Sequence, residues 1–421
     1  MEPTLLHPPL WMSFPFVILL AAIALAPLFF GDWWAKHYAK VCAGLGAAVV
    51  VYYIFALRGS PRVLHTAMEY FSFIALIGSL FIVSGGVHIN IKGEATPFTN
   101  VLFLALGAVI ANVLGTTGAS MLLIRPWIRM NKYRVTAHHI VFFIFIISNV
   151  GGCLTPVGDP PLFLGYLHGV DFWWVARHGW YIWLTAVGLL LSMFYVIDAR
   201  NYARAPKPLR EEMTHHDEWR FDGLANLFFL AIILGSVFIG KPPFLREILM
   251  IAAAVGSYFT TRKQVHESNH FTLHPIKEVA ILFVGIFATM MPALDWLAAN
   301  AGKLGSPTPG MYFFGSGALS SVLDNAPTYL SFLSALIGAT GTTDVHTLLR
   351  QHPDAILAVS MGAVFFGANT YIGNGPNFMV KAIADHQKVR TPGFIGYVAK
   401  FTLPFMLPML LAIWLIYFYT R

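Results

Sequence analysis

Apolar residues run through this chain in long segments separated by short polar stretches. Windows of about 19 residues predict ten membrane-spanning segments, each long enough for a helix that crosses a bilayer. Their approximate limits are 10–30, 40–57, 69–88, 136–167, 173–197, 222–240, 244–260, 277–294, 354–385 and 393–419. The pattern therefore predicts an all-α polytopic membrane protein.

Two further apolar stretches, each about one helix long, have polar or helix-breaking residues at their centres. They are 99–124, centred on Gly115, Thr116 and Thr117, and 310–338, centred on Asp324, Asn325 and Pro327. We interpret both as re-entrant helical hairpins, 99–128 and 310–338, whose tips end near the middle of the membrane.

Spans four and nine carry the same interrupting signature. It reads Gly152-x-x-Thr155-x-x-Gly158-Asp159-x-Pro161-x-Phe163 in the first and Gly367-x-x-Thr370-x-x-Gly373-Asn374-x-Pro376-x-Phe378 in the second. Such residues are tolerated at membrane depth where the freed backbone lines a protein or water cavity. Paired broken helices are typical of a transport site, although two kinked helices without a ligand are the alternative.

The two halves of the chain align with nearly constant offsets. A shift of 209 residues places Glu69 on Glu278, and a shift of 215 places Asp159 on Asn374. We predict a first repeat over 1–200, a linker over 201–221 and a second repeat over 222–421. Because each repeat contains five spans, an odd number, the second repeat should be inverted relative to the first.

Composition and charge agree with a membrane protein. Apolar residues make up 57% of the chain and charged residues 11%, far from the averages of soluble domains. With both termini outside, most of the 27 Lys and Arg residues fall in cytoplasmic segments, as the positive-inside rule requires. The linker and the first hairpin then lie on the cytoplasmic side, the second hairpin faces outside, and the positive charge does not indicate nucleic-acid binding.

Asp159 and Asp324 are the carboxylates predicted to lie deep in the membrane. A central Asp costs about 2.5–3.5 kcal/mol on insertion scales, so each needs a partner, a cation or a proton. Amide and hydroxyl groups surround them in the predicted arrangement, and hard oxygen donors suit Na⁺ rather than a soft transition metal. These residues are Asn149, Thr155, Asn325, Thr328, Asn369, Thr370 and Asn374, with Gly115, Thr116 and Thr117 at the first hairpin tip.

Several features allow other interpretations. Asp159 and Asp324 could cap a loop or a helix instead, and His138 and His139 are typical of the membrane interface. The segment 266–270 matches the HExxH zinc-protease pattern, but it falls in a predicted polar loop without an evident third ligand. No phosphate-binding loop motif occurs. We therefore expect neither an enzyme nor a cofactor.

The segments 148–159, 323–328 and 367–374 resemble the ion transporter superfamily, most closely its sodium/proton antiporter and citrate transporter branches. The resemblance covers nearly the whole chain. It implies a scaffold part, a moving transport part, a homodimer, and cation sites between hairpin tips and broken helices. By position, these sites combine Asn149, Thr155 and Asp159 with Thr116 and Thr117, and Asp324, Asn325 and Thr328 with Asn369, Thr370 and Asn374.

The chain departs from the antiporter pattern at the first hairpin tip, where Gly115, Thr116 and Thr117 replace an acidic-amide pair. Two functions stay open. Sodium/proton antiport is favoured because two aspartates would repel a citrate-like anion, and sodium-coupled uptake of citrate or a dicarboxylate is the alternative. The expected partners are small cations, a carboxylate in the second case, and the lipid of a bacterial inner membrane.

Overall fold

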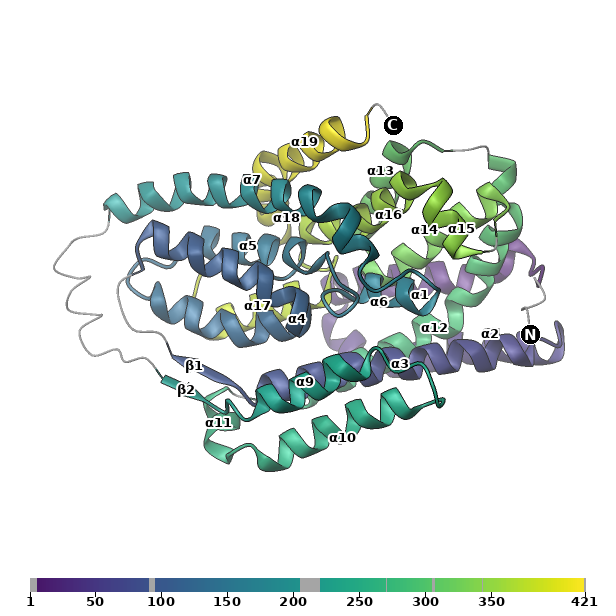
Figure 1. The fold of residues 1–421 in the computed structure, drawn as a ribbon, viewed down its shortest axis with the longest axis horizontal. Helices are drawn as coiled ribbons and strands as arrows, with labels where there is room; N and C mark the ends of the chain where they lie inside the picture. Colours follow the sequence, from purple (N-terminus) through teal and green to yellow (C-terminus); the bar gives the residue numbers. More distant parts are fainter. Residues whose placement is uncertain are drawn as a thin grey trace.

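The computed structural model describes residues 6–90, 95–204, 220–269, 271–304, 307–342 and 344–419, which are almost entirely helical (Figure 1). In chain order the elements are η1 (Leu10–Ser13), α1 (Phe14–Phe29), α2 (Gly31–Phe55), α3 (Ser60–Gly85), β1 (His88–Asn90), α4 (Pro97–Met130), α5 (Ala137–Ile146), η2 (Val150–Gly152), α6 (Pro160–Leu167), α7 (Trp174–Arg204), β2 (Arg220–Asp222), α9 (Asn226–Ser236), α10 (Leu245–Thr260), α11 (Lys263–Ser268), α12 (His274–Asn300), η3 (Ala301–Leu304), α13 (Pro309–Ser320), α14 (Asn325–Thr340), α15 (Val345–Gln351), α16 (Pro353–Phe365), η4 (Phe366–Asn369), α17 (Gly375–His386), α18 (Phe394–Tyr397), the π-helix η5 (Val398–Met406) and α19 (Leu407–Tyr417).

The ten predicted spans are all confirmed as helical segments. Seven helices of the described chain are long and apolar enough to cross a membrane. Spans four and nine are each interrupted as the sequence predicts, because α5 and α6 flank η2, and α16 and α17 flank η4. The protein is therefore a polytopic helical membrane protein, while the sides on which its termini lie remain a prediction.

Both predicted hairpins are confirmed as helical reversals, while their depth in the membrane and the side that each faces remain predictions. Helix α4 consists of two helical arms that reverse direction at Gly115, whose φ of 76° lies in the region that glycine readily adopts, and the next N–H, of Thr116, bonds to the Gly158 carbonyl instead of the helix. The reversal brings Asn100 beside Asn131, and their side-chain amides bond reciprocally at 2.9 and 3.1 Å. Helices α13 and α14 form the second hairpin through a turn that ends at Asp324.

The hairpins start in the same way. Thr96 and Thr308 each precede a proline at the first helical position, and each hydroxyl accepts the backbone N–H three residues later. A Thr cap followed by Pro at N1 is a strong start for a helix because it satisfies one orphan N–H and removes another. The shared start supports a duplicated origin of the two hairpins.

The helices form two groups. Helices α1, α2, α3, α9, α10 and α12 pack with one another, and we call them the helix panel. Helices α4 to α7 and α13 to α19 form the site bundle, and the short helix α11 belongs to neither group. In Figure 1 much of the panel lies along the lower side of the view. The groups meet where α3 contacts α4 and α6, and where α12 contacts α14.

Packing within the panel is reciprocal between the repeats. Helix α2 packs on α12, and α10 packs on α3, so the second span of each half lies against the third span of the other. The α2–α12 contact is close: a Cβ added to Gly285 would lie 2.8 Å from Cys42 Cβ. Small residues of this kind let helices approach in a membrane, where burial alone supplies little attraction between them.

The linker between the repeats differs from its prediction at both ends. Helix α7 continues to Arg204, and β2 at residues 220–222 pairs antiparallel with β1. The rest of the predicted linker, residues 205–219, lies outside the described residues. The polar loop predicted around His266 contains the short helix α11, whose six residues, Lys263–Ser268, make less than two turns. His270 of the same motif is outside the described residues.

Candidate functional site

Each broken helix is held by two glycines that face one another. A Cβ on Gly158 would lie 2.1 Å from the carbonyl oxygen of Gly152, and a Cβ on Gly373 would lie 2.5 Å from that of Gly367. Real Cβ atoms do not come so close to backbone, so any larger residue would force the break open. The repeated Gly spacing in the two signatures is therefore a steric requirement of the backbone.

The signature threonines attach the breaks to the hairpins. The Thr155 hydroxyl donates to the carbonyl oxygen of Asn112 at 2.6 Å, and the Thr370 hydroxyl donates to that of Ser321 at 2.6 Å. Each hydroxyl also accepts the N–H of the glycine three residues later, at 3.0 and 3.1 Å. Asn112 and Ser321 are themselves related by the 209-residue offset, so the two halves use the same brace.

Asp159 occupies the position where both hairpins and both broken helices meet. Its side chain is fully buried. Oδ1 accepts the Thr116 hydroxyl at 2.7 Å and the Asn374 amide at 3.4 Å, while Oδ2 accepts the Asn325 amide at 2.6 Å. These donors come from the first hairpin, the second broken helix and the second hairpin, and all three are uncharged.

A layer of buried amides supports this carboxylate. The Asn374 amide also donates to Asn149 Oδ1 at 3.2 Å and to the Ser148 carbonyl at 3.0 Å. The Asn149 amide donates to Asn377 Oδ1 at 2.7 Å. Asn377 in turn donates to the carbonyls of Gly367 and Thr370, at 2.8 and 2.9 Å. The network satisfies carbonyl groups that the broken helices leave free, as buried polar groups require.

One buried oxygen beside Asp159 lacks a hydrogen-bond donor. Asn325 is 0% exposed, and no described residue donates to its Oδ1. A small cavity of about 20 Å³ lies between the first hairpin tip and α3, lined by Gly115, Thr116 and Thr117 together with residues of α3 and of 156–163; neither Asp159 nor Asn325 lines it. A cavity of that size holds about one water molecule.

The other predicted site residues have different roles. Asp324 caps α14, since its Oδ1 accepts the Ala326 N–H at 3.0 Å, and this agrees with the capping alternative for that residue. The Thr328 hydroxyl donates to the carbonyl of Asp324 at 3.0 Å, within its own helix. The Asn369 amide donates to the Ser321 hydroxyl at 2.9 Å. Their part in cation binding remains a prediction, whereas Thr116, Asn325 and Asn374 touch Asp159.

Two residues that support the site were not predicted. Asn112 braces the first break with its side chain: its amide donates to the Gly151 carbonyl at 2.6 Å, and its Oδ1 accepts the Leu154 N–H at 2.9 Å. Asn377 supports the second break. The sequence carried a signal for Asn377, because it follows Asn374 by three residues and so lies on the same face of α17.

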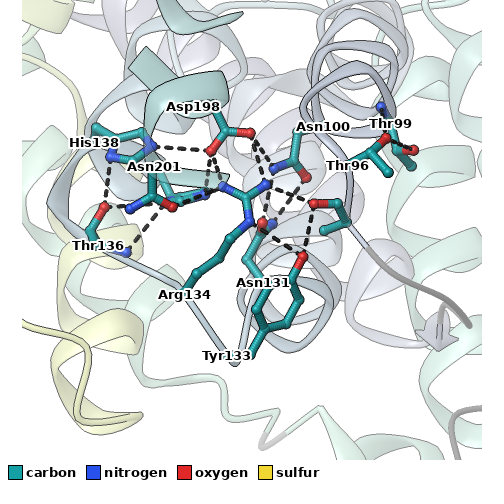
Figure 2. A network of polar contacts seen from close by, with 12 residues as sticks. Thr96, Thr99, Asn100, Asn131, Tyr133, Arg134, Thr136, His138, Asp198 and Asn201 are labelled. Atoms are coloured by element: carbon teal, nitrogen blue, oxygen red, sulfur yellow. Dashed lines mark hydrogen bonds and ion pairs between the residues drawn. The ribbon is translucent and has the colours of Figure 1, made fainter. Parts of the chain in front are cut away.

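A second buried polar network joins the base of the first hairpin to α5 and α7 (Figure 2). At its centre Arg134 pairs with both carboxylate oxygens of Asp198, with Nη2 at 2.9 Å from Oδ2. The Asn100 amide donates to the same Oδ2 at 2.9 Å. His138 and His139 belong to the same network: both are buried, with Nε2 atoms 3.2 and 3.0 Å from Asp198 Oδ1, and their depth in the membrane remains a prediction.

His138, His139 and Asp198 are close enough together to hold a metal ion, but their hydrogen bonds describe a different role. The Thr136 N–H donates to His139 Nδ1 at 3.2 Å, so a neutral His139 carries its proton on Nε2, which points at Asp198. The carboxylate is already occupied by the Arg134 guanidinium. The network is therefore a buried ion pair that fastens three elements together.

The comparison with protein families covers almost all of the chain. A family model described as putative citrate transport matches residues 6–418. No curated protein matches the chain. The matched range contains both hairpins, both broken helices and every residue around Asp159. The chain therefore belongs to the putative citrate transport family, a family of membrane transporters.

Proposed function

We propose that this protein is a cation-coupled secondary transporter in which Asp159 binds Na⁺ and a proton alternately. One observation carries the proposal: Asp159 is fully buried, and its described hydrogen-bond partners, Thr116, Asn325 and Asn374, are all neutral. A buried carboxylate without a cationic partner is costly in a membrane protein. A bound proton or metal cation removes that cost.

The surrounding oxygens favour a hard cation. Asn325 Oδ1 is buried without a donor beside the carboxylate, and Thr116 offers a hydroxyl oxygen. Oxygen ligands of this kind suit Na⁺. Because each of the four structural units at the site supplies a residue, occupation of Asp159 would change contacts between the hairpin tips and the broken helices. Such a change is what alternating access at the repeat interface needs. Asp324 is the second carboxylate that we expect to contribute.

Cation-coupled uptake of citrate or a dicarboxylate is the second candidate, favoured by the family match. Helices α6 and α17 begin at the same place, since their N-cap residues Asp159 and Asn374 are in contact. Two converging helix N-termini attract an anion. In this alternative Asp159 would have to be neutralised by the coupling cation before the anion could approach.

The two candidates differ in what Na⁺ does alone. In proteoliposomes with an acid interior and a pH-sensitive dye, external NaCl should raise the internal pH if the protein exchanges Na⁺ for protons. Asp159→Asn should reduce this signal to that of empty liposomes, and Asp385→Asn, which changes an exposed ion pair with Lys381, is the matched control. Accumulation of labelled citrate under a Na⁺ gradient, with no pH response to Na⁺ alone, would support uptake instead. Full activity of Asp159→Asn in both assays would refute the role of Asp159.

A further inference from the structure

Another buried carboxylate lies at the contact between the helix panel and the site bundle. Glu69 on α3 is 7% exposed. Its Oε1 lies 3.3 Å from Nε2 of His168, the residue that ends α6, and 3.6 Å from Nδ1 of His65. No described residue forms a regular hydrogen bond to this oxygen. The carboxylate is thus buried with imidazoles as its neighbours.

The other nitrogen of His168 determines where its proton sits. Nδ1 lies 2.9 Å from the carbonyl oxygen of Leu164. A carbonyl only accepts, so Nδ1 must carry a hydrogen. In a neutral His168 the other nitrogen, Nε2, would then carry no hydrogen. Its lone pair would lie next to the carboxylate oxygen of Glu69, and the two would repel. The contact becomes attractive when one more proton is present, on Nε2 or on Glu69.

The fixed charges near Glu69 are paired with other groups. On α3, Arg62 donates to Asp295 of α12 at 3.0 Å. From α10, Arg246 lies 2.7 Å from Glu247, whose Oε1 accepts the Ser72 hydroxyl on α3. On α6, the Tyr166 hydroxyl donates to the Val237 carbonyl. Among the described residues, the titratable groups that face Glu69 directly are therefore His65, which is 58% exposed, and His168, which is 24% exposed.

We propose that Glu69 and His168 form a proton-binding site that holds α6 against α3. With one additional proton on His168 Nε2 or Glu69 Oε1, the contact is attractive. When this proton passes to water through the partly exposed His168 edge, the contact turns repulsive. This inference concerns a site separate from Asp159, and it does not depend on which solute the protein carries.

The position of α6 gives this proton a mechanical consequence. Asp159 is the N-cap of α6 and His168 is its C-cap, so about 13 Å of helix separates them at 1.5 Å per residue. A helix this short moves as a unit. Loss of the proton at one end would release α6 from the panel and alter the position of the carboxylate at the other end.

Spectroscopy on the wild-type protein tests the shared proton directly. With ¹⁵N-labelled histidine in nanodiscs, His168 should keep both ring nitrogens protonated at neutral pH and expose a bare Nε2 resonance as the pH rises. If the proton resides on Glu69, the infrared spectrum should instead show a protonated carboxyl band that disappears in Glu69→Gln. A bare Nε2 at neutral pH together with the absence of that band would overturn the proposal.

Variants connect the proton to the α3–α6 contact. Thermal unfolding of the wild type should shift to lower temperature as the pH rises through proton release. The shift should be lost in Glu69→Gln, because a Gln amide can donate to a bare His168 Nε2 without an extra proton. The matched control is His178→Gln: His178 makes the same Nδ1 bond to a carbonyl, at 2.9 Å, without a carboxylate ion pair among the described residues. An unchanged pH shift in Glu69→Gln would contradict the proposal.

Discussion

Asp159 and Asn374 occupy equivalent positions in the two broken helices but differ in charge. Both cap a helix that has a proline in its first turn, and both have extended backbone angles. The amide in the second repeat can donate to the carboxylate in the first, at 3.4 Å, which two aspartates could not do without a proton. Because this one position differs between the two repeats, a single buried negative charge lies where the two hairpins and the two broken helices meet.

The facing glycines give a prediction at the residue scale. Gly158→Ala places a Cβ 2.1 Å from the Gly152 carbonyl oxygen, so the break must shift, and we expect a destabilisation of about 1–3 kcal/mol. Thermal unfolding in detergent measures it. Gly188→Ala on α7 is the control, since a Cβ there meets no atom within 4 Å and alanine favours helix over glycine. Equal unfolding temperatures for the two variants would show that the break is not sterically restricted.

At the scale of elements, the first hairpin depends on the network at its base. Asn100 and Asn131 join the two arms, and Asp198 of α7 accepts from both Asn100 and Arg134. Arg134 and Asp198 side chains are 2% and 0% exposed. We therefore expect the contacts at the base to help position the tip residue Thr116, which donates to Asp159.

Asp198→Asn tests this dependence. The substitution leaves the buried Arg134 guanidinium without its carboxylate, and loss of one partner of a buried ion pair costs about 3–5 kcal/mol. We expect a large decrease in thermal stability and cleavage by protease in the α4–α5 connection. Asp344→Asn changes a fully exposed helix cap and should leave both properties unchanged. Wild-type protease resistance in Asp198→Asn would mean that the hairpin does not need this ion pair.

At the scale of the whole molecule, the helix panel and the site bundle touch at repeat-equivalent places. Helix α3 contacts the first hairpin and α12 contacts the second. A cation bound at Asp159, as proposed, would contact elements of both repeats within the bundle. Its binding energy should therefore oppose unfolding of the entire bundle.

Sodium should stabilise the folded protein through this site. A ligand at 100 times its dissociation constant adds about 2.7 kcal/mol to the apparent stability of a one-site protein. We expect the unfolding temperature to rise with NaCl relative to choline chloride at equal ionic strength. Asp159→Asn should abolish the increase. A Na⁺-dependent increase that persists in this variant would place the main Na⁺ site elsewhere in the molecule.

The sequence by itself determined the helical segments, the hairpins, the two breaks and the burial of the Asp159 carboxylate among them. These features are local: long apolar runs specify spans, while glycine, proline and short polar residues specify where a helix must stop. The duplication was equally visible, because both repeats keep the same spacing of Gly and Thr. Asp159 stood out because few carboxylates occur within such apolar surroundings.

Only the tertiary structure decided which polar side chains reach Asp159. Thr116 and Asn325 do so, whereas Thr155 and Thr370 brace the backbone and Asp324 caps α14. The buried network of His138 and His139 and the Glu69–His168 contact were likewise unforeseen. The physical reason is that these contacts join helices far apart in sequence. They depend on how each helix is rotated and packed, which the local pattern of apolar and polar residues does not specify.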